Sequence, residues 1–415
     1  MSKKILIIGN SAKEYALAKA LSEKNDVFVA PGSAAMQDFA TCLDIREDSI
    51  SELLDFVLEN DIELTIPTSI KSINTNIVEV FQENNQEIFA PSEFAAKQIF
   101  DKIGVKKLLY KLRIPTPKFG IFEKQNIAMD YIKNLKNPFV VKTPEKSSSV
   151  ILTSKNTAKT VLDTAFLQKN QKVLIEDYIW GTPFAFYVIS DGYKALPITS
   201  SILYEHSLEG NGGQLTDGMG ACVPNYKFTL DNEVFMMTNV VYPLLDYLEV
   251  NKSPYLGILG IKGVLSESGD IQIVGFEPFF QNCDSAAALS LLEDDLIKLM
   301  QSCIVGSFSD EYEYITQKDC YASSIVLNCN SKNNKENVIS GIENLDELTQ
   351  LSFYSQIKKN RYLEFEADYG PVMVVTSLGK TVAKSTANVY EEQECITFAG
   401  KYYRKDICKS CNFDI

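Results

Sequence analysis

The sequence predicts a multidomain protein of the mixed α/β and α+β class that begins with a doubly wound parallel sheet. Its 415 residues exceed what one hydrophobic core usually supports. Strand-like and helix-like segments alternate over residues 1–100, which is the pattern of a parallel sheet with crossover helices. Long strand-like segments with hairpin-like turns follow later in the chain. These observations favour several subdomains built around more than one sheet.

In the N-terminal region, short apolar strands alternate with helices. The predicted strands are KILIIG, VFVAPG, LTIPT and IFAPS, and the predicted helices lie near residues 11–24, 51–59 and 74–84. Ligands of doubly wound sheets bind at the carboxyl ends of the strands. A ligand is therefore expected at the turns formed by residues 9–10, 31–32 and 67–69.

A lysine-rich segment from Ser92 to Leu112 is predicted to form one helix, which the two prolines of RIPTPKFG then end. Its lysines are Lys97, Lys102, Lys106, Lys107 and Lys111. Long charged side chains on a helix usually extend into solvent, so this lysine face is expected at the surface.

The middle of the chain alternates long strands with polar loops and two helices. FVVKTPEKSSSVIL is predicted as a strand, a polar loop and a second strand, and VLIEDYIWGTPFAFYVIS and YKALPITSSILYE as further strands. The glycine-rich loop EGNGGQLTDGMGACVP follows them. Helices are predicted near residues 232–250 and at LSLLEDDLIKLMQSCI, and from Tyr321 onward the pattern is mostly that of strands.

The segment IQIVGFEPFFQNCD contains the most informative acidic residue. Alternating apolar residues carry one carboxylate, Glu277, to the end of a strand, and Pro278, Phe279 and Phe280 follow directly. A carboxylate at a strand end indicates a metal or phosphate site. Mg²⁺, however, requires oxygen ligands in near-octahedral geometry, and phenyl rings supply none. The position fits a metal site, but the neighbouring residues do not.

Composition excludes several classes of function. A formal net charge of −14 argues against general binding to nucleic-acid phosphates. No apolar run reaches the roughly 18 residues that span a bilayer, and MSKKILIIGN is too short and polar for a signal peptide, so we expect a cytoplasmic protein without a membrane partner. The nine cysteines are predicted to be reduced thiols. Cys408 and Cys411 form one CxxC, and two interpretations stay open for it, a zinc site or a plain C-terminal tail.

In their order along the chain, these segments resemble the phosphoribosylamine–glycine ligase (glycinamide ribonucleotide synthetase) family of ATP-grasp enzymes. The segments that carry the resemblance are KILIIGNSAKEYALA, VAPGSA, RIPTP, VLIEDYIWG, TDGMGACVP, the Glu277 strand, TSLGKTVA and YYRKDI. The resemblance implies an N-terminal doubly wound domain (1–100), a central ATP-grasp domain (101–310) with a lid subdomain at about 115–185, and a C-terminal mixed domain (311–415).

The resemblance also implies a reaction. Members of the family join a carboxylate to an amine with ATP: glycine becomes an acyl phosphate that phosphoribosylamine attacks, as a step of purine biosynthesis. The implied cofactors are ATP and Mg²⁺ or Mn²⁺, and the implied partners are small-molecule substrates. The implied assembly is a monomer or a homodimer. No catalytic residue is assigned.

Individual residues acquire expected roles from the resemblance. Lys102 and Lys142 stand where the family contacts ATP phosphates, and Glu176, Asp177 and Ile179 match the hinge segment that holds adenine. The implied substrate-binding residues are Asn10, Glu14, Thr68, Gly218 and Gly220. The implied metal ligands are Glu277 and Asp284.

Around the nucleotide site, the sequence departs from the family pattern. TPEKSSSVIL replaces a glycine-rich phosphate loop, and non-glycine residues adopt positive φ only at a cost of about 1 kcal/mol or more. Serines 147–149 remain as alternative donors. Thr182 or Pro183 stands where an acidic ribose ligand is expected, Phe279 replaces an asparagine metal ligand and Gln281 replaces an arginine.

The substrate regions depart as well. Lys13 and Tyr15 replace an arginine and a histidine near the first turn, and Lys lacks the bidentate fork of Arg. PTSIKS replaces the family turn over the phosphoribosyl group, although Thr68, Ser69 and Lys71 could still hold an anion. His206 stands at an arginine position, either as a phosphate or carboxylate contact or as an ordinary structural or solvated histidine.

Two functional hypotheses stay open. The first is a diverged but working ligase, in which Glu277, Asp284 and Glu267 assemble an altered metal site. The second is a catalytically impaired relative that acts as a nucleotide-binding, regulatory or scaffold protein. Several losses affect one reaction, and each ~1.4 kcal/mol lowers a rate about tenfold, so the sequence favours impaired or altered chemistry. A third class, an α/β binding protein unrelated to ATP, would be preferred only if no cleft formed.

Overall fold

The N-terminal region folds around the predicted parallel sheet, but IFAPS is not the predicted strand, because only an isolated bridge joins Ile88 to Thr65. The computed structural model describes residues 2–136, 138–143, 149–167, 171–331 and 337–409. Its first sheet has the order β3-β2-β1-β4, and every pairing is parallel. The strands are β1 (Lys4–Gly9), β2 (Asp26–Pro31), β3 (Thr41–Cys42) and β4 (Leu64–Pro67). The helices of this region are α1 (Ala12–Ser22), α2 (Ile50–Glu59), α3 (Ile70–Ile73) and α4 (Ile77–Glu83).

The lysine-rich segment is not the single helix that the sequence predicts. It forms α5 (Glu93–Ile99) and α6 (Gly104–Lys111), separated by a turn that contains Lys102. The Asp101 carboxylate accepts the N–H of Ile103 at 3.0 Å, which stabilises the turn in place of continued helix. Because of this break, Lys102 lies outside both helices, where it is exposed and lines a cleft.

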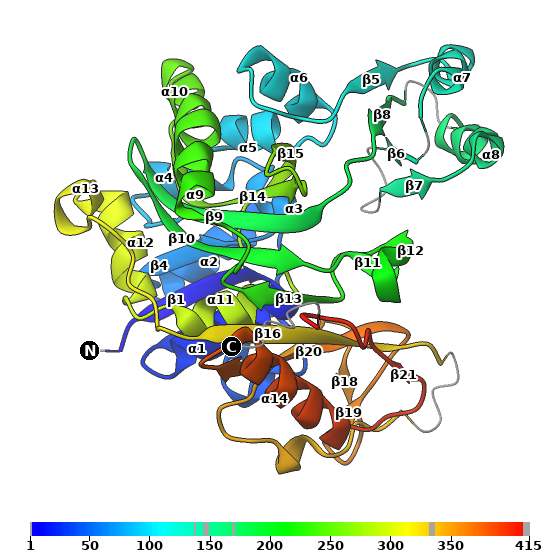
Figure 1. Ribbon diagram of the computed structural model, residues 1–415. Coiled ribbons are helices and arrows are strands. Elements are labelled where there is room, and N and C mark those ends of the chain that lie inside the picture. The colour runs from blue at the N-terminus through cyan, green and yellow to red at the C-terminus, as the bar shows by residue number, and fades with distance from the viewer. Residues whose placement is uncertain (1, 137, 144–148, 168–170, 332–336, 410–415) are drawn as a thin grey trace.

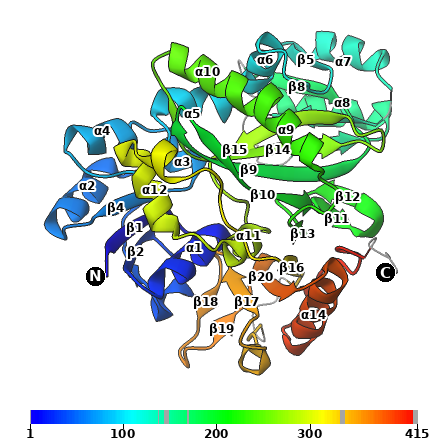
Figure 2. The same cartoon turned by 60° about the vertical axis from the view of Figure 1, so that its left-hand side comes forward.

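A small subdomain projects to one side of the molecule, as Figures 1 and 2 show. It is an antiparallel sheet of order β5-β8-β6-β7 covered by α7 (Gln125–Lys133) and α8 (Lys155–Ala165). Its strands are β5 (Phe119–Phe122), β6 (Phe139–Lys142), β7 (Val150–Leu152) and β8 (Val173–Asp177). A separate apolar core, which includes Phe139, Ile175 and Leu162, packs between this sheet and its helices. These elements fall within the residue range 115–185.

The centre of the molecule is a nine-stranded sheet, and its described strands pair antiparallel. Its order is β15-β14-β9-β10-β13-β16-β20-β17, and β21 pairs with β16. The strands from the middle of the chain are β9 (Thr182–Gly192), β10 (Ala195–Leu203), β13 (Gly220–Val223), β14 (Tyr255–Leu265) and β15 (Ile271–Glu277). The strands from its end are β16 (Tyr321–Cys329), β17 (Gln350–Phe353), β20 (Gly370–Gly379) and β21 (Lys401–Tyr402).

Helices bury both faces of this sheet. Because strand side chains alternate, β9 sends Phe186 and Val188 into one apolar core and Tyr187 and Ile189 into another. The first core includes α9 (Leu230–Met236), a π-helical turn (Met237–Val241) and α10 (Tyr242–Val250). The second includes α11 (Ser285–Leu291) and α12 (Leu296–Val305). The single helix predicted at LSLLEDDLIKLMQSCI is therefore wrong, because residues 292–295 separate α11 from α12.

The C-terminal part shares the central sheet. β13 pairs with β16 across the boundary expected at residues 310 and 311. The prediction of mostly strands from Tyr321 onward misses α14 (Val382–Cys395), which packs on β16 and β20 (Figure 1). Thr381 caps this helix by accepting the N–H of Lys384 at 3.2 Å. Shorter elements complete the fold: β11 (His206–Leu208), β12 (Gly212–Leu215), α13 (Phe308–Glu311), β18 (Lys358–Lys359) and β19 (Phe365–Glu366).

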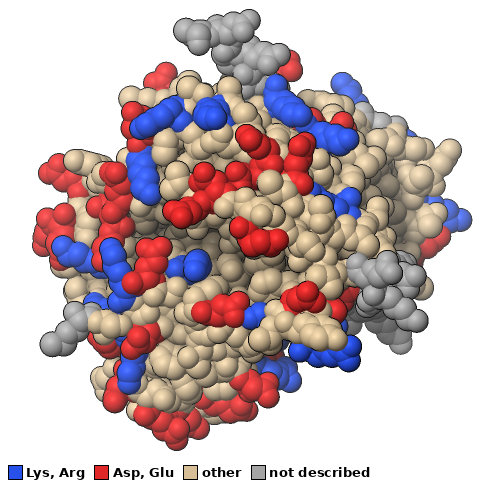
Figure 3. Space-filling view, turned by 90° about the horizontal axis from the view of Figure 1, so that it is seen from below, with Lys and Arg blue, Asp and Glu red and all other residues tan. Residues whose placement is uncertain are grey.

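The described helices include none that is long and apolar enough to cross a bilayer. On the face shown in Figure 3, lysines and arginines are interspersed with acidic side chains and form no extended basic field. That distribution agrees with the negative net charge of the chain.

Candidate functional site

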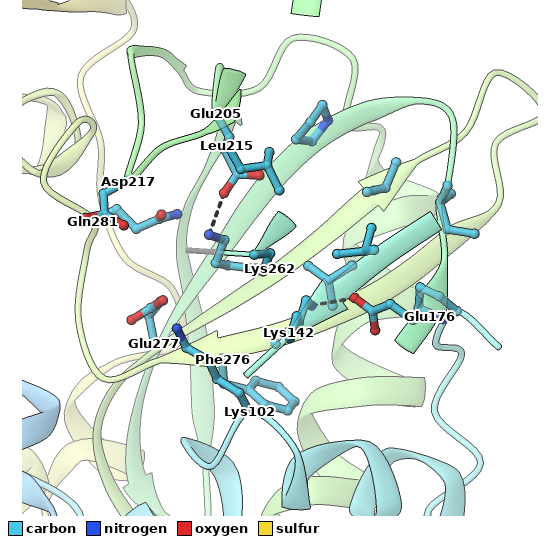
Figure 4. A pocket seen from close by; sticks show the side chains of 18 of the residues that line it. Lys102, Lys142, Glu176, Glu205, Leu215, Asp217, Lys262, Phe276, Glu277 and Gln281 are labelled. Atoms are coloured by element: carbon cyan, nitrogen blue, oxygen red, sulfur yellow. Dashed lines mark ion pairs between the residues drawn. The ribbon is translucent and has the colours of Figure 1, made fainter. Parts of the chain in front are cut away.

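A cleft of about 380 Å³ opens between the lid subdomain and the central sheet, a volume within the usual range for small-molecule sites. The lid contributes Lys142 from β6 and Glu176 from β8, and the central sheet contributes Lys262 from β14 and Glu277 from β15. Lys102 enters from the turn between α5 and α6. Figure 4 shows these side chains converging on one space. The structure thus brings together five of the residues expected at the nucleotide site, Lys102, Lys142, Glu176, Asp177 and Ile179.

On the lid side, Glu176 joins two lysines. Its carboxylate lies 2.5 Å from the Lys142 ammonium and 2.9 Å from the Lys106 ammonium. Burial alone would raise the pKa of Glu176, but the two ammonium groups outweigh it and lower this pKa. Burial also lowers the pKa of Lys106 to about 8, against the opposing effect of Glu176. The Glu176 side chain therefore positions Lys142 and does not extend into the cleft alone.

The prediction that the lysine face is solvated is wrong for Lys106, whose side chain is 0% exposed. It also donates to the Thr116 hydroxyl at 2.8 Å. Val105, Leu108 and Leu109 surround it in the helix, so its burial follows from the apolar face of α6. Sequence reasoning missed this residue because a lysine on an apolar helix face becomes recognisable only when its carboxylate partner is known.

On the opposite wall, Lys262 and Glu205 form an ion pair at 2.5 Å (Figure 4). Burial by itself lowers the pKa of Lys262, but Glu205 and Glu277 outweigh it and raise this pKa above the ordinary value, so the group stays an ammonium. Lys102 points toward Glu277 in Figure 4. Burial lowers the pKa of Lys102, and Glu277 opposes that effect. Sequence reasoning missed Lys262 and Glu205, for which no local motif gives a signal.

The described residues around Glu277 do not fit a divalent metal. Nowhere in the described part of the chain do three or more His, Cys, Asp or Glu side chains gather as metal ligands. The Lys102 and Lys262 ammonium groups interact with Glu277, and neither can donate a lone pair to Mg²⁺. Asp217, Gln281 and Asn282 carry oxygen atoms and line the same cleft. Phe279 turns instead into the apolar core, where it is 2% exposed.

Asp284 does not reach the cleft. It is fully buried, its Oδ2 accepts the Tyr187 hydroxyl at 2.7 Å, and its Oδ1 accepts the N–H of Gln281 at 2.9 Å. Burial raises the pKa of this carboxyl to about 6. The geometry therefore gives Asp284 a structural position and does not bring it to Glu277 as a second metal ligand.

The N-terminal residues expected at the substrate site bind one another. Glu14 is 1% exposed and accepts the Ser11 N–H at 2.7 Å and the Thr68 hydroxyl. Asn10 is partly buried beside them. Lys13 reaches the cleft wall and donates to the Thr68 carbonyl at 2.8 Å.

The possible anion site at Ser69 and Lys71 already contains the protein's own carboxylates. The Ser69 hydroxyl donates to Glu47 at 2.7 Å, and Lys71 lies 3.3 Å from Glu47 and 3.4 Å from Asp48. An incoming phosphate would have to displace these carboxylates.

Gly218 and Gly220 serve close packing. A side chain at Gly218, where φ is +114°, would lie 2.5 Å from the Cys283 sulfur, and one at Gly220 would lie 2.5 Å from the Ser324 carbonyl oxygen. The cleft is lined instead by the residues just before them, Thr216 and Asp217.

Other predicted positions have mixed outcomes. His206 lines the cleft, and burial lowers its pKa against the effect of Glu205. Pro183, Gln281 and Ser149 also line the cleft, whereas Ser147, Ser148 and Cys411 lie outside the described residues. Cys408 is buried.

A lysine-lined cleft between a small antiparallel lid and a larger sheet, next to a parallel N-terminal domain, defines the ATP-grasp class. The fold comparison supports this class. The crystal structure of phosphoribosylamine–glycine ligase from Thermotoga maritima superimposes with a TM-score of 0.79 at 19% identity, covering 97% of this chain and 100% of that one. The biotin carboxylase domain of Hydrogenobacter thermophilus 2-oxoglutarate carboxylase, solved with MgADP, ADP and bicarbonate, gives 0.71 at 13% identity over 97% and 92%.

The sequence comparisons identify the family. Residues 3–98 match the N domain of phosphoribosylglycinamide synthetase, and residues 100–285 match its ATP-grasp (A) domain. The phosphoribosylamine–glycine ligase of Neisseria meningitidis serogroup A is 27% identical over 97% of this chain and 98% of its own length. That of Haemophilus influenzae is 28% identical over 97% of each. The chain belongs to the phosphoribosylamine–glycine ligase family, and the predicted resemblance and fold class are confirmed.

Proposed function

We propose that the cleft binds an adenine nucleotide, with the base at the hinge segment 176–179 and the phosphates toward Lys102 and Lys142. Membership of an ATP-grasp family supports ATP as the nucleotide. Apolar side chains from both walls, including Val140, Ile151 and Phe276, offer a sandwich for a flat base. Lys102, Lys142 and Lys262, which line the same cleft, offer positive charge to phosphates.

The proposal further holds that ligation of glycine to phosphoribosylamine is strongly reduced or altered. The observation that carries this part is the ammonium of Lys262 beside Glu277, where a metal-dependent enzyme would need oxygen ligands. Phosphoryl transfer depends on positioning and charge neutralisation by metal ions and basic groups. If two such contributions of a few kcal/mol are missing, the rate falls by several powers of ten, since each ~1.4 kcal/mol is about tenfold.

A second candidate, a working ligase with altered substrates, is favoured by the retained cleft and its retained lysines. It would require ligands other than Asp284 to complete a metal site around Glu277. In both candidates the partners are small molecules, in a cytoplasmic protein that is a monomer or a homodimer. The reduced-activity protein would act through nucleotide binding in a regulatory or scaffold role.

A pair of measurements tests the proposal. Calorimetric titration with ATP and ADP should give binding, and a coupled assay of ADP release with glycine, phosphoribosylamine and Mg²⁺ should give turnover far below that of a family ligase measured alongside. Turnover at the ligase's own rate would refute the reduced-chemistry proposal and favour the second candidate. Absence of nucleotide binding would refute both.

A further inference from the structure

Lys262 lies in the cleft at a position where the neighbouring strand leaves space for its side chain. In the pairing of β14 with β15, Lys262 is opposite Gly275 and Gly260 is opposite Glu277, so Lys262 and Glu277 are diagonal neighbours on adjacent strands. A side chain at Gly275 would meet no atom within 4 Å. The absence of a side chain there leaves space for the Lys262 ammonium beside Glu277.

Charge is closely balanced in this part of the cleft. The lining includes four lysines and five carboxylates, and one of those carboxylates, Glu176, is shared with the buried Lys106. Lys262 is paired with Glu205, which follows β10, and its side chain remains 22% exposed to the cleft. The ammonium is therefore held in place and accessible at the same time.

We propose that Lys262 is the cation that meets the phosphates of a bound adenine nucleotide, so that nucleotide binding needs no divalent metal. The Glu205 carboxylate holds this ammonium while the cleft is empty, and an incoming phosphate takes over as its partner. This inference rests on the proposed nucleotide site. It adds that Lys262 contacts the phosphates and that nucleotide binding does not depend on a metal.

The exchange is physically reasonable because the ammonium changes one anionic partner for another. Lys is a compact point charge with three donors, so it can contact Glu205 and a phosphate oxygen together or in turn. A divalent cation at the same place would face the repulsion of Lys262 and of Lys102. Mg²⁺ in solution also reduces the charge of the nucleotide and thus its attraction to the lysines.

Calorimetric titration of the full chain with ADP and with ATP, in EDTA and in excess Mg²⁺, tests the inference. Affinity in EDTA should equal or exceed that in Mg²⁺. Lys262→Met should weaken metal-free binding about tenfold or more, and Lys262→Arg should retain it, since both keep the length of the side chain but only Arg keeps the charge. Glu205→Gln should strengthen binding several-fold because it releases the ammonium.

Lys359→Met is the matched control. Lys359, whose side chain is 16% exposed, forms a pair at 2.5 Å with the more exposed Asp38; neither residue lines the cleft, so its removal should leave nucleotide affinity unchanged. Lys262→Met should lower nucleotide affinity and Glu205→Gln should raise it. If the ion pair were merely structural, removing either partner would change the affinity in the same direction. Circular dichroism of each variant reports whether it is folded.

The outcomes distinguish this inference from the proposed function. Binding that requires Mg²⁺, or that Lys262→Met leaves unchanged in EDTA, overturns the role of Lys262 while the nucleotide site stands. No binding in either buffer overturns the nucleotide site and the inference together. Metal-free binding that falls in Lys262→Met and rises in Glu205→Gln supports both.

Discussion

Replacement of Glu176 by Gln should destabilise the protein strongly, because it removes the charge that two lysines share. Glu176 lies 2.9 Å from Lys106 and 2.5 Å from Lys142, and the Lys106 side chain is 0% exposed. Gln preserves the shape of the side chain and leaves a buried ammonium without a counter-ion. The perturbation therefore tests charge and not packing.

The expected loss is about 3 kcal/mol. Attraction at 2.9 Å amounts to about 6 kcal/mol at an effective dielectric constant of ~20, but desolvation of both ions offsets much of it. Burial already brings the pKa of Lys106 from 10.5 to about 8, which corresponds to roughly 3 kcal/mol at ~1.4 kcal/mol for each pH unit. Removal of one partner of a buried pair typically costs ~3–5 kcal/mol.

Urea unfolding followed by circular dichroism measures this loss, and its pH dependence tests the cause. In Glu176→Gln, Lys106 should be a neutral amine in the folded state and an ammonium in the unfolded state. The free energy of removing its proton falls as the pH rises toward 10.5, so the stability of the variant should rise with pH. In the wild type, Lys106 keeps its proton up to a pH of about 8. From about pH 6 to about pH 8 the variant should therefore gain ~1.4 kcal/mol per pH unit relative to wild type.

The double variant Lys106→Met/Glu176→Gln provides the control. It removes both buried charges, so it should recover most of the stability that Glu176→Gln loses. A loss below about 1 kcal/mol in Glu176→Gln, or a double variant no more stable than the single one, would refute the claim that the charge of Glu176 stabilises this cluster.

Three further predictions concern packing, titration and binding. Gly218→Ala should lose about 2 kcal/mol in thermal unfolding, because its φ of +114° disfavours a side chain and a Cβ would meet the Cys283 sulfur; an unchanged melting temperature would contradict this. Burial raises the pKa of Asp284 to about 6, so this group should lower the free energy of unfolding by about 3 kcal/mol as the pH rises from about 4 to 7. Asp284→Asn should remove that pH dependence, and equal slopes of stability against pH in the variant and the wild type would disprove the assignment. Trp180, the one tryptophan, is 71% exposed beside Tyr178 of the hinge, so binding of ADP should change its fluorescence, and Trp180→Phe should show no such change. No fluorescence change at saturating ADP would exclude the hinge as the base site.

The local sequence pattern predicted the helices and strands better than the positions at which they are interrupted. The short apolar segments in KILIIG and LTIPT were enough to predict the parallel strands β1 and β4. The segment from Ser92 to Leu112 was predicted as one helix, although Asp101, whose side chain accepts the Ile103 N–H, and Gly104, a poor helix former, lie where it divides. The helix α14 was missed because its Val and Thr residues suit a strand as well as a helix.

The residues of the candidate site were likewise only partly predictable from the sequence. Lys102, Lys142 and Glu277 could be named from sequence, and all three reach the cleft. Their partners could not be named, because an ion pair such as Lys262 with Glu205 joins residues far apart in the chain and leaves no local spacing. Asp284 is the reverse case: its place seven residues after Glu277 is compatible with a metal ligand, but the folded chain directs its carboxylate to the Tyr187 hydroxyl.

The amino-acid sequence by itself determined the family, the fold class and the parallel N-terminal sheet, because these follow from local periodicity and from the order of short motifs. Only the tertiary structure decided which charges neutralise which. Glu176 is enclosed by Lys142 and Lys106, and Lys262 lies beside Glu277. Coulombic energy depends on distances of a few ångströms between strands that are far apart in the sequence, and those distances exist only in the folded molecule.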